Sequence, residues 1–238
     1  RNGRVLIADN NGGNRVLDGV DLAVRAGEVH ALIGSNGAGK TTLVDAVSGF
    51  LPAYGGQVRL AGDPLEGCTV QARAARGLRR TFQQGRAVDA LTVDESLWIA
   101  AASVPGSRAA RRQRVRAVHA YFALPDGTVP VRLMDAGSRR VLEIAATLVA
   151  EPRVLLLDEP AAGLADAESH ALAERVRRIP EAFGCSVLVI EHDMTFVRAA
   201  ADRVTVLDDG RVLAYGAVDA VLHDARVIAA YLGEEVAP

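Results

Sequence analysis

The chain has 238 residues, half of them hydrophobic, which is enough for one large α/β domain or for one domain that carries a sub-domain. Its 27 Lys and Arg residues nearly balance 29 Asp and Glu residues, a formal charge of -2. This balance argues against a dedicated nucleic-acid-binding protein, which usually has a large basic excess, so we expect no nucleic-acid partner.

No apolar run reaches the ~18 residues that a membrane-spanning helix needs. The two distant cysteines, Cys68 and Cys185, are expected to be reduced thiols. The start at Arg1 rather than Met suggests a trimmed chain or a piece of a longer polypeptide, and a fusion to a permease stays open.

Short runs of β-branched and aliphatic residues predict strands towards both ends of the chain. The predicted strands are residues 4–8, 16–24, 29–33, 57–60, 154–157, 187–190, 204–207 and 212–215. The predicted helices are residues 40–49, 93–103, 108–124, 138–150, 166–179 and 194–200. A turn at Asp208-Asp209-Gly210 predicts that the last two strands form a hairpin. The alternation of strands and helices predicts an α/β fold with a mainly parallel sheet, into which a helical stretch from about 82 to 150 is inserted.

The strongest local signal is a glycine-rich loop between the predicted strand 29–33 and the helix that follows it. The loop fits the pattern G-x-x-x-x-G-K-[ST] and reads Gly34-Ser35-Asn36-Gly37-Ala38-Gly39-Lys40-Thr41-Thr42. Glycines let the backbone curl so that its N–H groups point at phosphate oxygens, and the start of the helix adds its positive dipole end. Lys40 supplies a positive charge for the β- and γ-phosphates, and the Thr41 hydroxyl can join the shell of Mg²⁺. We therefore expect these nine residues, the phosphate loop, to bind ATP with Mg²⁺.

Two later strands are followed by polar residues at the sheet edge where open α/β folds bind ligands. Strand 154–157 leads into Asp158 and Glu159, and strand 187–190 leads to His192. We expect Asp158 to hold Mg²⁺ and Glu159 to act as the general base that polarises the attacking water. His192 would emerge at the same edge, contact the γ-phosphate and orient the water. Taken alone, the Asp158–Glu159 pair could be a surface turn after a strand, and a lone histidine is usually structural or merely exposed.

The phosphate loop, the run Leu155-Leu156-Leu157-Asp158-Glu159-Pro160 and His192 together resemble the ABC ATPases. Arg80-Thr81-Phe82-Gln83 is similar to the Q-loop of that family, which implies that Gln83 touches the Mg²⁺ site and senses the γ-phosphate. The resemblance covers about residues 4–232 and is greatest to the ATPase subunits of branched-chain amino acid importers, although urea and amide uptake systems share much of the pattern. It implies ATP hydrolysis that powers uptake of branched-chain amino acids or related small polar solutes. It also implies a cytoplasmic dimer, peripheral on the inner face of the plasma membrane, bound to membrane permease subunits.

The same resemblance implies a single ABC ATPase domain over residues 1–238. Residues 1–81 and 151–238 would form the P-loop NTPase core with an antiparallel β sub-domain, and residues from about 82 to 150 would form a helical sub-domain.

The sequence departs from the family pattern in three places. Two of them, the signature and the D-loop, are segments through which the subunits of such dimers contact each other, and the third is the residue that stacks on adenine. The family signature Leu-Ser-Gly-Gly-Gln corresponds here to the signature stretch, Met134-Asp135-Ala136-Gly137-Ser138. Asp135 would place a carboxylate beside the partner's γ-phosphate, which is unfavourable by at least about 1 kcal/mol unless Asp135 is protonated or turns away. The aromatic residue that stacks on adenine is missing near Asn11, which leaves Val16 as an apolar substitute. The D-loop has lost its acid and reads Ala162-Gly163-Leu164-Ala165.

The residues that the chain would use for its own catalysis are kept, and these are Lys40, Gln83, Asp158, Glu159 and His192. We therefore expect a heterodimer with a second ABC ATPase subunit that carries a normal signature, rather than a homodimer. Two alternatives stay open: a nucleotide-binding subunit with weak turnover, and a soluble ABC ATPase without a transport role. The direction of transport rests on the resemblance alone, because phosphate chemistry does not distinguish import from export.

Overall fold

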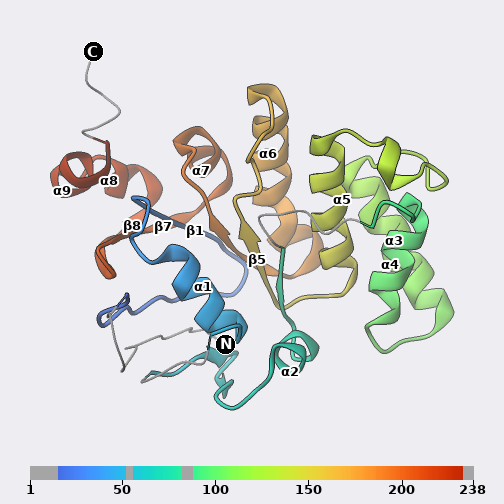
Figure 1. The fold of residues 1–238 in the computed structure, drawn as a ribbon, viewed down its shortest axis with the longest axis horizontal. Helices are drawn as coiled ribbons and strands as arrows, with labels where there is room; N and C mark the ends of the chain where they lie inside the picture. Colours follow the sequence, from blue (N-terminus) through green and yellow to red (C-terminus); the bar gives the residue numbers. More distant parts are fainter. Residues whose placement is uncertain (1–15, 52–55, 82–87, 233–238) are drawn as a thin grey trace.

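A six-stranded sheet forms the centre of the protein, in a computed structural model that describes residues 16–51, 56–81 and 88–232 (Figure 1). The strand order is β4-β5-β6-β1-β7-β8, and every neighbouring pair is parallel except the hairpin β7–β8. A separate antiparallel pair, β2–β3, forms a small second sheet. The strands are β1 Val29–Gly34, β2 Arg59–Leu60, β3 Asp63–Pro64, β4 Leu78–Arg80, β5 Val154–Asp158, β6 Ser186–Ile190, β7 Arg203–Asp208 and β8 Arg211–Ala217.

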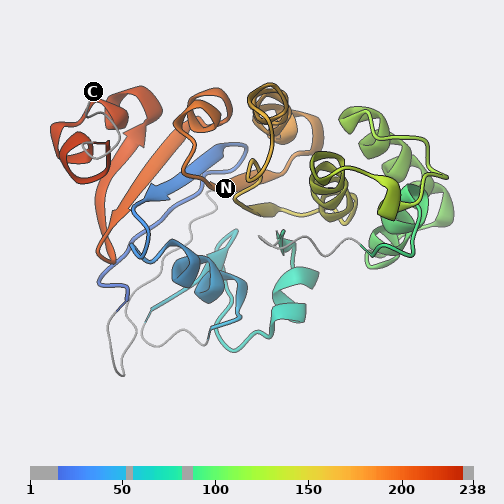
Figure 2. The ribbon, with the colours of Figure 1, turned by 45° about the horizontal axis from the view of Figure 1, so that its top comes forward.

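Helices cover both faces of the large sheet. Seen along the sheet, α6 and α7 lie on one face and α1 lies on the other (Figure 2). The α-helices are α1 Lys40–Ser48, α2 Val70–Ala75, α3 Val93–Ala102, α4 Arg108–Phe122, α5 Ala136–Val149, α6 Asp166–Phe183, α7 Met194–Ala200, α8 Val218–Leu222 and α9 Ala225–Val227. Two further turns are the 3₁₀ segment Val131–Leu133 and the π-helical segment Ile228–Leu232.

The two faces of the sheet have separate hydrophobic cores because successive side chains of a strand point to opposite faces. In β1, Val29 and Ile33 belong to the core under α6 and α7, whereas Leu32 belongs to the core under α1. Strands β1, β5 and β6 are buried along their whole length, as expected for parallel strands covered on both sides. The sheet is therefore packed on both faces where its strands reach the phosphate loop and the acids.

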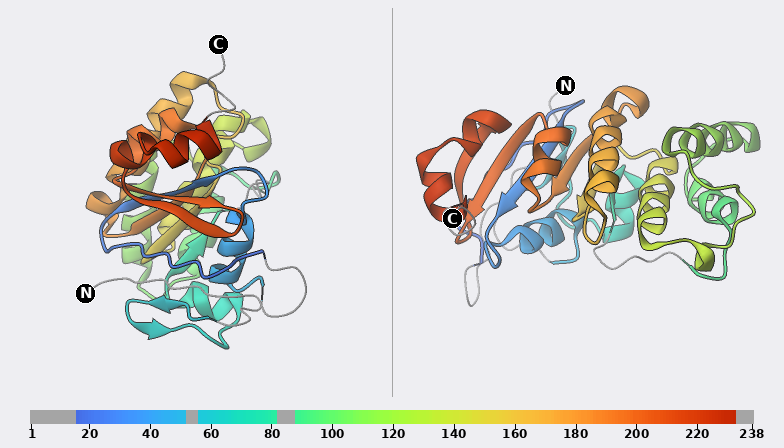
Figure 3. Two further views of the ribbon diagram at one scale, coloured as in Figure 1. Left: turned by 90° about the vertical axis from the view of Figure 1, so that its left-hand side faces the viewer. Right: turned by 90° about the horizontal axis from the view of Figure 1, so that it is seen from above.

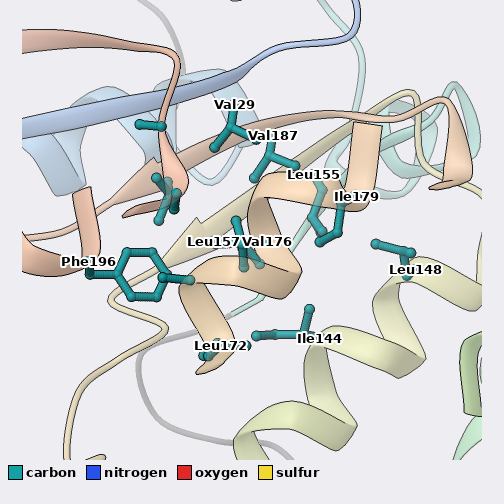
Figure 4. Close-up of a cluster of buried hydrophobic side chains, with 14 of the residues drawn as sticks. Val29, Ile144, Leu148, Leu155, Leu157, Leu172, Val176, Ile179, Val187 and Phe196 are labelled. Carbon is teal, nitrogen blue, oxygen red and sulfur yellow. The ribbon is translucent and has the colours of Figure 1, made fainter. Parts of the chain in front are cut away.

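Helices α3, α4 and α5 form a group beyond the β4–β5 side of the sheet (Figure 3). Helix α5 joins this group to the rest, because Ile144 and Leu148 are buried in the same core as Leu172 and Ile179 of α6 (Figure 4). The signature stretch at the start of α5 is thus anchored through a continuous apolar core.

The structure confirms the expected α/β fold with a mainly parallel sheet, a small antiparallel sheet and inserted helices. One predicted strand is wrong, because residues 16–24 pair with no strand in the described part of the chain. Val20, Leu22 and Val24 are buried in alternation as in a strand, but the alternation here reflects burial of one side of the segment without ladder pairing among the described residues, and the positive φ of Gly19 interrupts it before residue 20. The predicted strand 4–8 lies outside the described residues.

Several short elements were not predicted from the sequence. They are β3, α2, β4, α8 and α9. Strand β4 is only three residues long and has the sequence Leu-Arg-Arg, which lacks the apolar pattern of a strand. It nevertheless pairs with the buried β5. The predicted strand 57–60 shortens to the two residues of β2, and the predicted helix 166–179 continues to Phe183.

Candidate nucleotide-binding site

The phosphate loop connects the carboxyl end of β1 to the first turn of α1. Gly34 ends the strand with φ 154°, and a Cβ atom there would lie 2.1 Å from the carbonyl oxygen of Leu207 in β7. Gly39 precedes the helix in the left-handed region, at φ 100°, and no side chain caps the helix start. The first N–H groups of α1 are therefore left to an anion, which the positive end of the helix dipole also favours.

Lys40 lies inside its own loop. Its Nζ atom donates to the carbonyl oxygens of Gly34 at 2.6 Å and Ser35 at 2.9 Å. Burial lowers the pKa of Lys40, and the charge of Glu159 partly opposes that effect. Lys40 and Glu159 are thus close enough to interact electrostatically, although they are far apart in sequence. Elsewhere in the loop, Asn36, Gly37 and Thr41 are exposed, Ser35 and Thr42 are half-buried, and Ala38 is buried.

Asp158 ends β5 as a nearly buried carboxylate. Its Oδ2 atom accepts a hydrogen bond from Nη2 of Arg80 at 2.6 Å, and the same guanidinium pairs with Asp45 of α1. Asp158 is in register with Ile190 of β6, and Ile190 is in register with Leu32 of β1. The structure therefore brings Asp158, the end of β6 and the phosphate loop to one edge of the sheet.

Glu159 follows the strand with a backbone φ of 46°, a left-handed conformation that is rare for residues other than glycine. Its backbone N–H donates to the carbonyl oxygen of Ile190 at 2.9 Å, which holds the turn in place. A strained residue of this kind costs about 1–3 kcal/mol and often occurs where a side chain must point at a ligand.

His192 follows β6 on the same edge, and 64% of its side chain is exposed. Its Nδ1 atom lies 4.0 Å from Oε2 of Glu191, which is longer than a hydrogen bond. The histidine is thus on the predicted edge and is accessible there.

Glu191 is a buried acid for which we predicted no role. Its carboxylate accepts hydrogen bonds from the backbone N–H of Ala161 at 2.8 Å and of His192 at 3.1 Å. It therefore ties the loop after Glu159 to the loop that carries His192. Burial raises the pKa of Glu191, and the backbone hydrogen bonds partly oppose the rise. No sequence signal indicates such a connection, because Ala161 is an alanine that contributes only its backbone.

The signature stretch begins α5, with Asp135 as the residue that caps the helix. The carboxylate of Asp135 accepts from the backbone N–H of Ser138 at 2.7 Å and from its hydroxyl at 2.9 Å. These hydrogen bonds lower the pKa of Asp135, so the exposed carboxylate is charged and turned back onto its own helix. Met134 is buried, and a Cβ atom on Gly137 would lie 3.1 Å from Leu164, so the stretch packs closely against the loop that leads into α6. Ala136 is the first residue of the helix.

Two further predicted residues concern adenine and the metal. Val16 is 37% exposed, and its carbonyl oxygen lies 3.1 Å from where a Cβ atom of Gly39 would be, so the segment runs along the phosphate loop. Gln83, predicted for Mg²⁺ and catalysis, lies outside the described residues, as does Asn11.

The residues present suit a magnesium ion. Magnesium prefers oxygen ligands and usually keeps waters and substrate phosphates in its shell rather than an all-protein cage. The hydroxyl of Thr41 and the carboxylate of Asp158 supply such oxygens, and the Arg80 bridge to Asp45 holds that carboxylate beside α1. Within the described residues, no cluster of three or more His, Cys, Asp or Glu side chains offers a different metal site.

An apolar groove of about 260 Å³ opens between α3 and α5, next to β4. Its lining includes Val88 and Ile99, which are 55% and 60% exposed, and Arg80 lies in its wall. A larger cleft of about 600 Å³ lies between β3 and the start of β5 and does not include the phosphate loop. In the described part of the chain, no helix is long and apolar enough to cross a membrane.

Comparison with known proteins gives the family. The family model described as "ABC transporter" matches residues 17–162, which carry the phosphate loop and the Asp158–Glu159 pair. The chain belongs to the ABC transporter ATPases. A second model, described as "Branched-chain amino acid ATP-binding cassette transporter", matches residues 211–237.

Individual relatives agree with this family. The chain is 34% identical over 94% of both chains to the high-affinity branched-chain amino acid transport ATP-binding protein LivG of Salmonella typhimurium. It is 33% identical, with the same coverage, to the corresponding protein BraF of Pseudomonas aeruginosa. Among solved structures, it is similar to the ADP conformation of MJ1267, an ATP-binding cassette of an ABC transporter, with a TM-score of 0.84, 27% identity and coverage of 97% and 98%. The expected ABC ATPase is confirmed: the chain is an ATP-binding subunit of a transporter and an ATP hydrolase.

Proposed function

We propose that this chain powers the uptake of branched-chain amino acids or of related small polar solutes, as a cytoplasmic subunit on the inner face of the plasma membrane. The observation that carries the proposal is similarity over 94% of both chains to ATP-binding proteins named for high-affinity branched-chain amino acid transport. The family-model match over residues 211–237 supports the same solute class from a separate part of the chain.

The phosphate loop binds the triphosphate of ATP through the N–H groups at the start of α1, which no side chain of the described residues caps. Lys40 leaves the carbonyl oxygens of its own loop and neutralises the β- and γ-phosphates. Thr41, Asp158 and Gln83 would hold Mg²⁺, which would offset the negative charge of the phosphates.

Glu159 acts as the general base that accepts a proton from the attacking water, and the strained turn behind it fixes where its carboxylate points. His192, exposed on the same edge, orients the water and contacts the γ-phosphate. Glu191 keeps the two loops together during this step, because its carboxylate accepts hydrogen bonds from both of them.

The chain forms a single ATPase domain, in which residues 1–81 and 151–238 make the core with the β sub-domain. Residues from about 82 to 150 make the helical sub-domain, and the groove between α3 and α5 receives a cytoplasmic helix of the permease. The exposed apolar side chains of Val88 and Ile99 support this, because an apolar groove with polar walls suits an amphipathic helix.

The second ATPase subunit is a different chain with a serine in its signature. The position of Asp135 supports this, because its carboxylate caps α5 through Ser138 and adds a negative charge where a signature serine would meet the partner's γ-phosphate. The same feature favours one alternative, a nucleotide-binding subunit with weak turnover.

The test is ATP hydrolysis by the wild-type chain and by Glu159→Gln, each alone and with candidate permease and ATPase partners. We expect Glu159→Gln to lower kcat by about 10²-fold or more while ATP still binds, because the glutamine cannot accept the proton. Partners should raise the wild-type rate and not that of the variant. Equal rates for the two proteins with every partner would instead support the subunit with weak turnover.

A further inference from the structure

Arg80 makes an unexpected connection between two acids of the site. Its side chain is only 8% exposed, at the carboxyl end of β4. One nitrogen of the guanidinium donates to Oδ2 of Asp158 at 2.6 Å, and the other pairs with Asp45. The planar fork of an arginine can hold two carboxylates in fixed directions, which a lysine cannot do with its single ammonium group.

The second acid places this bridge beside the phosphate loop. Asp45 follows Thr41 by four residues in α1, so the two side chains lie on the same face of the helix. Arg80 therefore holds Asp158 against the helix face that carries the other protein oxygen proposed for Mg²⁺. Without the guanidinium, two nearby carboxylates would repel each other, and Asp158 would be a nearly buried acid without its cation.

Arg80 also lies next to the groove proposed for the permease. Arg80 and Thr81 are both in the lining of that groove. The Thr81 hydroxyl accepts a hydrogen bond from the backbone N–H of Asp158 at 3.4 Å. Two neighbouring residues thus contact the metal-binding acid from one side and the groove from the other.

We propose that Arg80 is a positioning residue for Mg²⁺: it holds the carboxylate of Asp158 in its metal-binding orientation and connects that orientation to the groove. The inference rests on the proposed nucleotide and metal site and adds a residue that the phosphate chemistry does not require. Outer partners of this kind typically change metal affinity by 10–100-fold when they are removed.

If Arg80 instead competed with the metal, its removal would change the effect of Mg²⁺ on nucleotide binding in the opposite direction. If Arg80 mainly competed with the metal for Oδ2 of Asp158, removing it would strengthen the effect of Mg²⁺ on nucleotide binding. The sign of the change therefore separates positioning from competition.

The experiment measures binding of the ATP analogue AMPPNP to the full chain by calorimetry, with Mg²⁺ and with EDTA. The quantity compared is the ratio of the two affinities. Arg80→Gln should lower this ratio about tenfold relative to wild type. Arg79→Gln is the matched control, because it removes the same charge from the adjacent residue of β4, whose side chain points to the other face and reaches Ser103.

Thermal unfolding is followed in parallel, to establish that each variant is folded. If Arg80→Gln does not fold, Arg80→Lys replaces it, with Arg79→Lys as the control. The lysine keeps the charge but cannot hold both acids, so its ratio should fall several-fold. An unchanged or increased ratio in a folded Arg80 variant would overturn the proposal. A wild-type chain whose AMPPNP affinity is the same with Mg²⁺ and EDTA would overturn the proposed metal site as well.

Discussion

The phosphate loop and the signature stretch both lead into a helix, yet they begin that helix in opposite ways. Helix α1 starts after a glycine in the left-handed region, without a side-chain cap. Helix α5 starts at Asp135, whose carboxylate accepts from the N–H group of Ser138. The first start leaves its N–H groups to a phosphate, whereas the second already holds an anion of its own. The start of α1 therefore offers its N–H groups to a triphosphate, and we propose that the start of α5 is a poor contact for a triphosphate on another subunit.

The largest effect is expected from a change that prevents the start of α1 from forming, because the phosphate loop would then lose its helix N–H groups. In Gly34→Ala, the new Cβ atom would lie 2.1 Å from the carbonyl oxygen of Leu207, a backbone atom in a central strand that cannot move aside. We expect this variant to lose about 3 kcal/mol or more of unfolding free energy, measured by urea denaturation, together with ATP binding.

Gly37→Ala is the matched control for that variant. Gly37 also has a positive φ, of 83°, but nothing lies within 4 Å of the new Cβ atom. Only the backbone strain of about 1–2 kcal/mol should remain. Equal losses in the two variants would contradict the close approach of β1 and β7 as the cause.

The start of α5 can be changed to resemble an ordinary signature. In Asp135→Ser, the serine can still cap α5, because serine and aspartate are similarly good at that position, and the negative charge is removed. If the charge costs about 1 kcal/mol at the partner's γ-phosphate, ATP hydrolysis by the purified chain alone should rise about fivefold, with little change in stability.

Asp135→Ala separates the cap from the charge. It removes both, and it should lower the unfolding free energy by about 1 kcal/mol. Brisk hydrolysis by the wild-type chain that Asp135→Ser leaves unchanged would contradict the heterodimer proposal.

The smallest expected effect is on the pH dependence of the unfolding free energy. It arises because burial shifts the pKa of a carboxylate that accepts backbone hydrogen bonds. Asp135 is exposed and its pKa is lowered, whereas Glu191 is buried and its pKa is raised. A raised pKa in the folded state gives a stability contribution that is present below the unfolded value of 4.5 and is lost as the pH rises through the folded value.

The unfolding free energy lost in Glu191→Gln should therefore be larger near pH 5 than at pH 7.5. Asp135→Asn should show the opposite slope, but only at lower pH, because a lowered pKa contributes stability that is lost as the pH falls below the unfolded value of 3.8. Urea denaturation of both variants and wild type from about pH 3 to about pH 7.5 measures the two slopes, that of Asp135→Asn below its unfolded pKa and that of Glu191→Gln above its own. Slopes of the same sign would contradict the contrast between the two sites.

Much of this protein follows from local sequence. Glycine spacing, one lysine and the buried run before Asp158 predict the phosphate loop and the acids, because backbone curvature and strand burial depend on residues close together in the chain. The same holds for the parallel sheet, whose apolar strands alternate with helices. The false strand at residues 16–24 shows the limit, since its hydrophobic residues are buried without a ladder partner among the described residues.

Only the tertiary structure decided which polar groups meet. Arg80 reaches acids 35 and 78 residues away, and Glu191 accepts from an N–H group 30 residues away. No spacing rule predicts these contacts, because they depend on which strands and helices become neighbours. Asp135 shows the same division: its residue type was evident from the sequence, but the fold determined that its carboxylate turns onto Ser138 and stays charged. Sequence thus specifies the chemistry available at the edge of the sheet, and packing specifies the orientation of each group, because orientation depends on contacts between distant segments.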